Sequence, residues 1–433
     1  MAILTRWLGF DPRTMRLRTE MVAGLTTFLT MSYVLAVNPA VLGATGMDRE
    51  ALFTVTALVS AVATLLLAFM AKLPFAQAPS VGLNAFFAFT LVQGMGYSWQ
   101  EALAALLIEG VIFILITFLN IRERILEALP GTLRHSVSAG IGMFIAFIGL
   151  KQAGIIEADP STFVRLGRFT HASVLAMGGI VLSGVLMALR VRGALFYGIA
   201  ACTLVGIPLG VTVIPDGFSA VSVPYSPAPT LCKFDFSQLL TPDMAVVILT
   251  LLFMNVFDTV GTLIGLASKT GIVGSDGRIP RVKEAMLSDA VGTTFAAVMG
   301  CSTVTTYVES ASGIAEGGRS GVTAFVVAVL FLAALFFGPL FLLIPPAATV
   351  GAMVLVGAFM IDSVARIDLN DISEALPAFV TMLMMVLTYS IVEGIVLGIL
   401  CYVLVKMLSG RYREVSRTMY VLALLLALKY IFF

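Results

Sequence analysis

The sequence predicts an all-α polytopic membrane protein of 14 transmembrane segments, arranged as a 7+7 inverted repeat. Of its 433 residues, 59% are hydrophobic and only 12% are charged, whereas soluble domains carry about 25% charged residues. Apolar stretches that could cross a bilayer core of about 30 Å recur along the chain. Two shorter, interrupted segments, 80–95 and 303–315, occupy matching places in its two halves.

Fourteen stretches fit membrane segments when the two interrupted ones, segments 3 and 10, are counted. The long stretch 373–409 is divided because its centre, 389–394 (YSIVEG), is polar. The apolar tail 419–433 is short, so it is expected to lie along the membrane interface or to pack on the bundle rather than to form a fifteenth segment. The predicted segments are 20–42, 51–72, 80–95, 100–119, 134–150, 172–190, 192–209, 243–266, 281–300, 303–315, 319–338, 345–361, 373–390 and 391–409.

Basic residues predict the orientation, because cytoplasmic loops of membrane proteins collect Lys and Arg. With the N-terminus inside, these segments place 21 of the 26 Lys and Arg residues on the cytoplasmic side. One missed segment would reverse the bias further along the chain. Both termini are therefore predicted to be cytoplasmic, in a protein of the plasma (inner) membrane. The N-terminus has no apolar core or cleavage site, so no signal peptide is expected. The basic residues left outside are Arg49, Lys151, Arg165, Arg168 and Lys233.

A proline-rich loop, 210–242, divides the chain into a first repeat, 1–209, and a second repeat, 243–410, followed by a cytoplasmic or interfacial tail, 411–433. With seven segments in each half, the second half is inserted upside down. The halves align weakly, with Asn84 over Glu309. Under-length segments at matching places are typical of an inverted-repeat transporter whose site lies between the two breaks.

Three carboxylates stand inside predicted segments, where a charged side chain costs about 2.5–3.5 kcal/mol on insertion scales and marks a functional candidate. Asp258 lies in the eighth segment. Glu309 lies in the break of the tenth segment, at the position that Asn84 occupies in the break of the third. A simple helix cap is the alternative for Glu309. For Glu109, in the fourth segment, structural and functional roles stay equally open.

Two carboxyl groups and an amide suit a flat, neutral ligand that forms hydrogen bonds, such as a purine base. A carboxylate can accept from N1–H and N2–H of guanine or from N1–H of hypoxanthine. Unpaired backbone donors are expected where the half-helix starts, at Val308, Glu309 and Ser310. Aromatic rings could stack on the base. These residues alone do not separate a purine from an anion or an amino acid. The candidates for stacking are Phe86, Phe87, Phe257 and Tyr307.

Four motifs resemble the AzgA-like purine permeases of the nucleobase–ascorbate transporter superfamily. The last two of them are specific to this group, and the match covers nearly the whole chain. The motifs are 24–39 (GLTTFLTMSYVLAVNP), 78–89 (APSVGLNAFFAF), 251–269 (LLFMNVFDTVGTLIGLASK) and 305–319 (TTYVESASGIAEGGR).

The resemblance implies proton-coupled uptake of hypoxanthine, guanine or adenine by alternating access. It implies a core domain of segments 1–4 and 8–11 that moves against a gate domain of segments 5–7 and 12–14, often in a homodimer. Related uracil permeases carry a histidine four residues after the acid of segment 8, where this chain has Thr262. The proton is therefore expected on Asp258 or Glu309. The predicted substrate contacts are Asn84, Asp258, Glu309, Val308, Ser310, Phe257, Leu83 and Thr27.

The expected partners are a purine base, a proton and membrane lipid. With a net charge of +1 and four cysteines without metal-ligand spacing, no nucleic acid, metal or cofactor is expected. An anion transporter of the same architecture, like the sulfate and bicarbonate carriers, is the alternative, but neither break contains the Lys or Arg that an anion site needs. An enzyme would need a metal or nucleophile cluster, and a channel would not need interrupted repeats.

Overall fold

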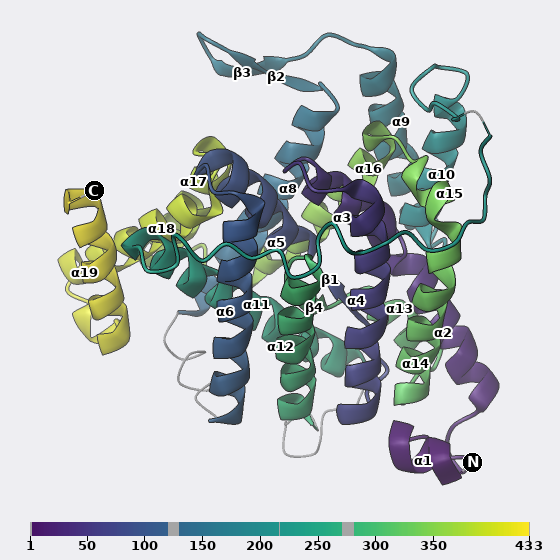
Figure 1. Ribbon diagram of the computed structural model, residues 1–433. Coiled ribbons are helices and arrows are strands. Elements are labelled where there is room, and N and C mark those ends of the chain that lie inside the picture. The colour runs from purple at the N-terminus through teal and green to yellow at the C-terminus, as the bar shows by residue number, and fades with distance from the viewer. Residues whose placement is uncertain (1, 120–129, 216, 271–280, 433) are drawn as a thin grey trace.

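Long apolar helices dominate the computed structural model, which describes residues 2–119, 130–215, 217–270 and 281–432 (Figure 1). By length and composition, eight helices within these residues could cross a membrane. The chain is therefore a multi-pass membrane protein, while the predicted total of fourteen segments stays a prediction. The eight are Leu17–Gly43, Arg49–Met70, Trp99–Phe118, Gly131–Gln152, His171–Ala188, Gly321–Leu342, Pro346–Arg366 and Ile391–Leu408.

The first half of the chain contains both α-helices and a π-helix, η1, together with three short strands. Its elements are α1 (Ala2–Leu8), α2 (Leu17–Met31), α3 (Val34–Gly43), α4 (Arg49–Met70), β1 (Gln77–Pro79), α5 (Val81–Ala85), η1 (Phe86–Gly94), α6 (Trp99–Phe118), α8 (Gly131–Gln152), β2 (Ile156–Asp159), β3 (Phe163–Leu166), α9 (His171–Ala188) and α10 (Ala194–Gly206).

The second half begins with the longest helix and has one described strand. Its elements are α11 (Pro242–Thr270), α12 (Val282–Met299), β4 (Val304–Thr306), α13 (Ser310–Ala315), α14 (Gly321–Ala334), η2 (Leu335–Phe337), α15 (Gly338–Leu342), α16 (Pro346–Met360), η3 (Ile361–Arg366), α17 (Ile372–Leu387), α18 (Ile391–Leu408), η4 (Tyr412–Glu414) and α19 (Arg417–Phe432).

Local sequence signals explain several helix boundaries. The Asp48 side chain accepts a hydrogen bond from the backbone N–H of Ala51 at 2.8 Å and so caps α4. Ser98 and Glu101 form a reciprocal capping box at the start of α6. The predicted division of 373–409 is confirmed, because α17 ends at Leu387 and α18 begins at Ile391, with Ser390 as its cap.

The first predicted segment, 20–42, is interrupted at residues 32–33, between α2 and α3. Leu35 N–H donates to Ser32 O at 3.0 Å, three residues back, which tightens the chain into a 3-10 turn. Pro39 lies inside α3 and has no N–H to donate to the carbonyl of Leu35. The predicted segment agrees with the membrane-length stretch Leu17–Gly43, and the interruption within it places Tyr33 directly before α3.

Two short strands, β1 just before the predicted segment 80–95 and β4 near the start of 303–315, were not predicted from the sequence. β1 and β4 pair antiparallel, with Gln77 opposite Thr306 and Pro79 opposite Val304. Ser80 N–H donates to Thr303 O at 2.9 Å just beyond the ladder. These two breaks, more than 200 residues apart in the sequence, therefore lie side by side.

The outer edges of this small sheet bond to threonine side chains from two helices. The Thr64 hydroxyl on α4 donates to Gln77 O at 2.9 Å and accepts from Gln77 N–H at 3.0 Å. The Thr293 hydroxyl on α12 does the same for Val304, at 3.2 and 3.1 Å. Because unpaired backbone groups are costly inside a membrane, these hydroxyls allow a strand pair to lie among the helices.

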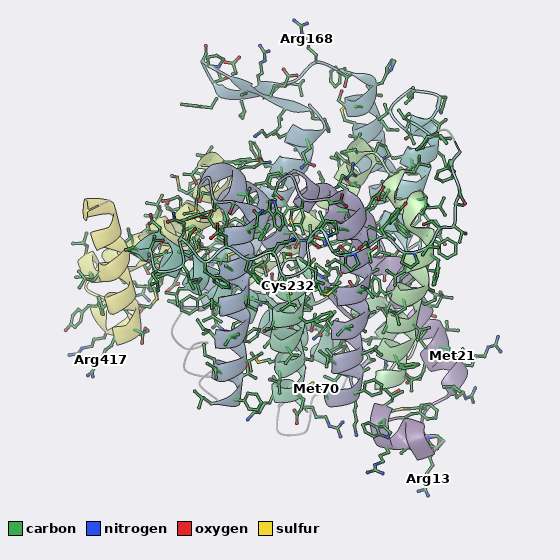
Figure 2. The ribbon with its side chains drawn as sticks, in the orientation of Figure 1. Arg13, Met21, Met70, Arg168, Cys232 and Arg417 are labelled. Atoms are coloured by element: carbon green, nitrogen blue, oxygen red, sulfur yellow. The ribbon has the colours of Figure 1, made fainter. Side chains whose placement is uncertain are left out.

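The helices pack in two groups. The first consists of α2, α4, α6, α11, α12, α13 and α14, among which α6, α12, α4 and α14 run side by side (Figure 1); the second consists of α8, α9, α10, α16, α17 and α18. The C-terminal helix α19 packs on α18, one of the two places expected for the apolar tail. Arg13 and Arg168 lie at opposite ends of the molecule (Figure 2).

Packing of α2 on α13 predicts that Gly313 cannot be enlarged. A Cβ atom at Gly313 would lie 2.1 Å from Thr27 Oγ1 and 2.6 Å from Ala23 O. Gly313→Ala should therefore lower the free energy of unfolding by about 1–3 kcal/mol, measured as thermal unfolding in detergent. The control is Gly178→Ala on α9, where nothing lies within 4 Å of the new atom. Equal melting temperatures for the two variants would contradict the close contact.

Candidate functional site

Glu309 lies directly before α13, where the sequence predicts the start of a half-helix. Its carboxylate makes no capping bond to the helix among the described atoms. Instead, the hydroxyl of Tyr33 donates to Glu309 Oε1 at 2.8 Å. Tyr33 is 2% exposed, and its ring centroid lies 6.5 Å from that of Tyr307. The alternative of a simple helix cap therefore does not describe Glu309.

Asp258 comes from α11 and faces the other break. The hydroxyl of Ser80, the residue before α5, donates to Asp258 Oδ2 at 3.2 Å. Because β1 and β4 pair antiparallel, Asp258 lies where β1 ends, and Glu309 lies beyond the end of β4, at the opposite end of this short sheet.

The backbone donors expected around Glu309 are only partly free. Ser310 N–H donates to Tyr307 O at 3.1 Å, so the expectation that it serves a ligand is not met in this structure. The Ser310 hydroxyl accepts from Ala76 N–H at 3.0 Å and so ties α13 to the chain before β1. Val308, two residues before α13, is 51% exposed.

Asn84 is fully buried on α5, and its amide Nδ2 donates to Asn38 Oδ1. Asn38 Nδ2 in turn donates to Thr56 Oγ1 at 2.6 Å. Within the described part of the chain Asn84 Oδ1 has no hydrogen-bond partner. The side chain therefore has a donor that holds the break together and an acceptor that is still free.

The remaining predicted contacts differ in what the structure describes. Leu83 on α5 and Thr27 on α2 are buried, and Thr27 packs directly against Gly313. Phe86 and Phe87, at the start of η1, are buried as well. The side chain of Phe257 lies outside the described residues, so its stacking role stays a prediction.

Glu109 has a partner that the sequence did not reveal. Asn255 on α11 donates to Glu109 Oε1 at 3.1 Å and to Thr293 Oγ1 at 3.3 Å. Because Thr293 also bonds to β4, Glu109 is connected to the strand pair through Asn255. Glu109 Oε2 and Asn255 Oδ1 have no partner among the described residues.

Asp289 on α12 is a further buried acid, which sequence analysis missed. Thr259 Oγ1 donates to its Oδ2 at 2.5 Å and Thr306 Oγ1 to its Oδ1 at 3.2 Å. Gln77 Nε2 donates to the same Oδ1 and to Ser288 Oγ, the latter at 2.9 Å. Asp289 thus joins α11, β1 and β4. Asp289 lies inside the predicted segment 281–300. An acid inside an apolar segment is the same signal that identified Asp258, so it could also have identified Asp289.

The described residues contain no group of three or more His, Cys, Asp or Glu side chains that could hold a metal ion. The four cysteines are free. The buried one that touches this region is Cys301, whose sulfur accepts from Asn38 Nδ2 at 3.3 Å. In the described hydrogen bonds, the acids Glu309, Asp258, Glu109 and Asp289 accept from hydroxyl and amide groups of the protein.

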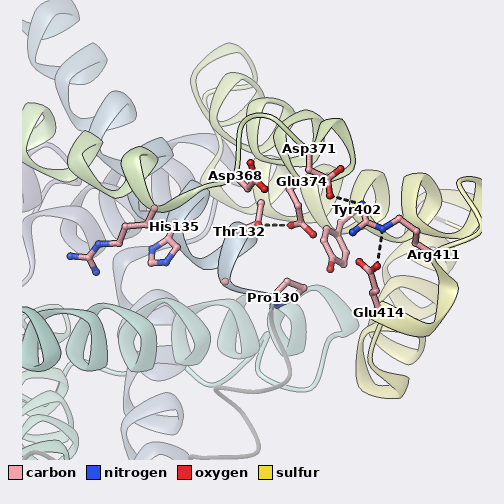
Figure 3. Close-up of a pocket in the computed structure, with 11 residues that line it drawn as sticks. Pro130, Thr132, His135, Asp368, Asp371, Glu374, Tyr402, Arg411 and Glu414 are labelled. Atoms are coloured by element: carbon pink, nitrogen blue, oxygen red, sulfur yellow. Dashed lines mark hydrogen bonds and ion pairs between the residues drawn. The ribbon is translucent and has the colours of Figure 1, made fainter. Parts of the chain in front are cut away.

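A separate charged cleft of about 550 Å³ opens between the ends of α8, α17 and α18 and the following turn, η4 (Figure 3). Lys406 is fully buried and pairs with Glu374 at 2.6 Å and Glu414 at 2.7 Å. Just outside the predicted segment 373–390, hydrogen bonds from Arg411 and Ser373 lower the pKa of Asp371 to about 2. None of these elements carries a predicted substrate contact, and ion pairs already occupy most of the charges.

Comparison with known proteins identifies relatives along the whole chain. The family model described as "Permease family" matches residues 18–397. A putative permease of Methanocaldococcus jannaschii is 44% identical over all of this chain and 99% of that protein. The adenine permease AdeQ of Escherichia coli is 40% identical, covering 99% and 96% of the two chains. The guanine/hypoxanthine permease PbuG of Bacillus subtilis is 41% identical, covering 98% of each. These relatives confirm the resemblance to purine permeases.

Solved structures show the same fold at low sequence identity. The transmembrane domain of the cyanobacterial bicarbonate transporter BicA has a TM-score of 0.66 and 16% identity, covering 88% of this chain and 97% of that one. SLC26A9 has a TM-score of 0.65 and 11% identity, covering 94% and 69%.

Replacement of Asp289 tests its bonds to the strands. Asp289→Ala leaves the donors of Gln77, Thr259 and Thr306 without their acceptor, and each buried unsatisfied donor costs about 1–3 kcal/mol. We expect a loss of at least about 2 kcal/mol of stability in thermal unfolding, and a smaller loss for Asp289→Asn. The exposed Asp362, replaced by Ala, is the control. If Asp289→Ala melts like that control, its contacts do not stabilise the site.

Proposed function

This chain belongs to the Permease family, and we propose that it is a secondary active transporter that imports purine bases together with protons by alternating access. The observation that carries the proposal is the Glu309 carboxylate. One of its oxygens is held by Tyr33, and a second acid, Asp258, bonds to Ser80 of the other interrupted segment, which pairs with the first through β1 and β4. The other oxygen of Glu309 is the proposed acceptor for an N–H group of the base. Relatives named adenine permease and guanine/hypoxanthine permease support this substrate class.

Asp258 and Glu309 are also the groups that we propose to carry the proton. Both stand in the second repeat, and neither has a cation as a partner in the described ion pairs. An excess charge near the middle of a membrane is costly. Protonation of one acid would let the loaded site change its exposure without moving that charge across the bilayer.

For the architecture we propose fourteen segments in a 7+7 inverted repeat, with both termini in the cytoplasm of the inner membrane. The paired roles of Thr64 and Thr293 support it, because each stands on the helix that precedes a strand and bonds to that strand in the same way. The two packed groups of helices support a core of segments 1–4 and 8–11 and a gate of segments 5–7 and 12–14. A homodimer in the lipid bilayer completes this proposal.

An anion transporter of the same architecture is the second candidate. The likeness to BicA and SLC26A9 concerns the fold alone, so it does not distinguish an anion transporter from a purine transporter. The side-chain chemistry favours the purine. Around the two breaks the described contacts of Glu309 and Asp258 come from the hydroxyl groups of Tyr33 and Ser80. Two carboxylates at one place repel an anion and accept hydrogen bonds from a neutral base.

Uptake of radiolabelled hypoxanthine tests the substrate class. In proteoliposomes containing this chain, unlabelled purines should compete and uracil, sulfate and bicarbonate should not. Glu309→Ala should abolish hypoxanthine binding, because the acceptor for the base is removed, yet the variant should still insert into the membrane. Glu50→Ala, at the exposed start of α4, is the matched control that keeps binding. Competition by sulfate alone would favour the anion transporter, and normal binding by Glu309→Ala would exclude this site.

Asp258→Asn tests the coupling. The amide resembles the protonated acid, so the variant should keep purine exchange across the membrane. It should lose at least about tenfold of the accumulation driven by an imposed pH gradient, corresponding to about 1.4 kcal/mol. The measurement compares uptake in proteoliposomes with and without the gradient. Undiminished accumulation would move the coupling role to Glu309 or Glu109.

A further inference from the structure

Polar side chains of α2, and of Tyr33 in the turn after it, meet Glu309, α13 and the start of α14 at successive levels. The Tyr33 hydroxyl donates to Glu309 Oε1 at 2.8 Å. One turn earlier on α2, the hydroxyls of Thr30 and Ser312 share a hydrogen bond of 2.8 Å. At the beginning of α2, the buried Glu20 accepts from Thr323 Oγ1 at 2.5 Å. We call this series the α2 ladder.

The order of these contacts fixes how the two segments are aligned. Residue numbers fall along α2 while they rise along α13 and α14, so the segments run antiparallel and each contact supports the next. Between the ladder bonds, the backbone of Gly313 lies against Thr27 with no room for a Cβ atom. Glu20 also accepts from the backbone N–H of Arg319 at 3.0 Å, which fixes the turn after α13. The main chain of Glu309 therefore cannot move away from α2 without breaking several buried bonds.

The contact of Tyr33 with Glu309 differs from the other contacts of the α2 ladder, because its acceptor is the carboxylate that we propose to bind the base. Tyr33 has one O–H to donate and is 2% exposed, so its hydroxyl has no ready alternative in water. A hydrogen bond to an ionised carboxylate is about twice as strong as one between neutral groups. Tyr33, directly before α3, makes the described hydrogen bond to Glu309, and its ring centroid lies 6.5 Å from that of Tyr307.

We propose that Tyr33 is a positioning residue that sets which purine Glu309 prefers, an inference that rests on the proposed function of Glu309. Its hydroxyl occupies Oε1 and turns Oε2 toward the base, so the carboxylate presents one acceptor to the ligand. A base with a single N–H at this edge, such as hypoxanthine, is satisfied by that oxygen. Guanine brings a second N–H, at N2, which competes with Tyr33 for Oε1.

This arrangement predicts opposite consequences for the two bases when the hydroxyl is removed. In Tyr33→Phe the carboxylate is no longer fixed, and hypoxanthine binding should weaken about tenfold, as expected for the loss of one hydrogen bond to a charged group. For guanine, N2–H can take the place that the hydroxyl left. Its affinity should change by less than about threefold, so the preference for guanine over hypoxanthine should rise.

The experiment measures the dissociation constants of hypoxanthine and guanine by calorimetry on the purified full-length chain in detergent, for wild type, Tyr33→Phe and Thr30→Val. Thr30→Val removes the neighbouring hydroxyl of the α2 ladder without touching Glu309, and it should lower the melting temperature but keep the ratio of the two constants. Both constants come from one preparation, so partial unfolding of a variant does not alter their ratio.

The outcomes separate this inference from the proposed function. A raised preference for guanine in Tyr33→Phe alone supports the positioning role. Equal losses for both bases, or the same ratio in all three proteins, would overturn it while leaving Glu309 as the acceptor. Binding of neither base by the wild type, or normal binding by Glu309→Ala, would overturn the proposed function and this inference with it.

Discussion

A two-stranded sheet among membrane helices is the constraint on which the rest of this structure depends. A strand pair in such a place has outer edges that no water can satisfy, and each unpaired N–H or C=O is costly there. Threonines on α4 and α12 solve this for Gln77 and Val304. Pro79 has no N–H, and its carbonyl accepts from the Tyr307 hydroxyl at 2.5 Å. The backbone can therefore leave the helical path without leaving these groups unpaired.

The functional residues follow from this arrangement. The antiparallel strands lead into α5 at one end of the sheet and toward α13 at the other, where Ser80 bonds to Asp258 and Tyr33 bonds to Glu309, respectively. Asp289 bonds to the side chains of both Gln77 and Thr306, the residues opposite each other in the sheet. Four acids thus lie around one small sheet. Asp258 and Glu309 lie near its two ends, Asp289 bonds to its side chains, and Glu109 is connected to it through Asn255. Asp289 accepts from both amide and hydroxyl groups and Glu109 accepts from an amide, whereas Asp258 and Glu309 each accept from a hydroxyl in the described hydrogen bonds.

The coarse fold and two site residues could be predicted from the sequence, because hydropathy and buried charge are local properties. Apolar length identified the long helices, and an acid in an apolar segment identified Asp258 and Glu309. The strands could not be found in this way, since three residues such as Gln77–Pro79 are too few to show an alternating pattern. Tyr33 looked like one aromatic among many, and its role depends on a partner 276 residues away. Ser310 looked like a free backbone donor, but the turn that begins α13 uses its N–H.

The kinds of contact also differ between and within the two groups of helices. Within the first group, α2 and α14 are joined by a buried hydrogen bond between Thr323 and Glu20, and breaking it would leave polar groups unsatisfied. Between the groups, Arg192, in the turn before α10, forms an ion pair with Glu316, at the end of α13, and the arginine is 62% exposed. Water can replace such a pair at a cost of about 0–1 kcal/mol. At another contact, the ring of Phe89 on η1 meets that of Tyr389, between α17 and α18 of the second group, edge to face at 6.4 Å.

A group of helices that is held together by buried hydrogen bonds, and that contacts its neighbour through replaceable contacts, can move as a unit. The proposed alternating access needs this property, and here it arises from where the polar side chains are buried.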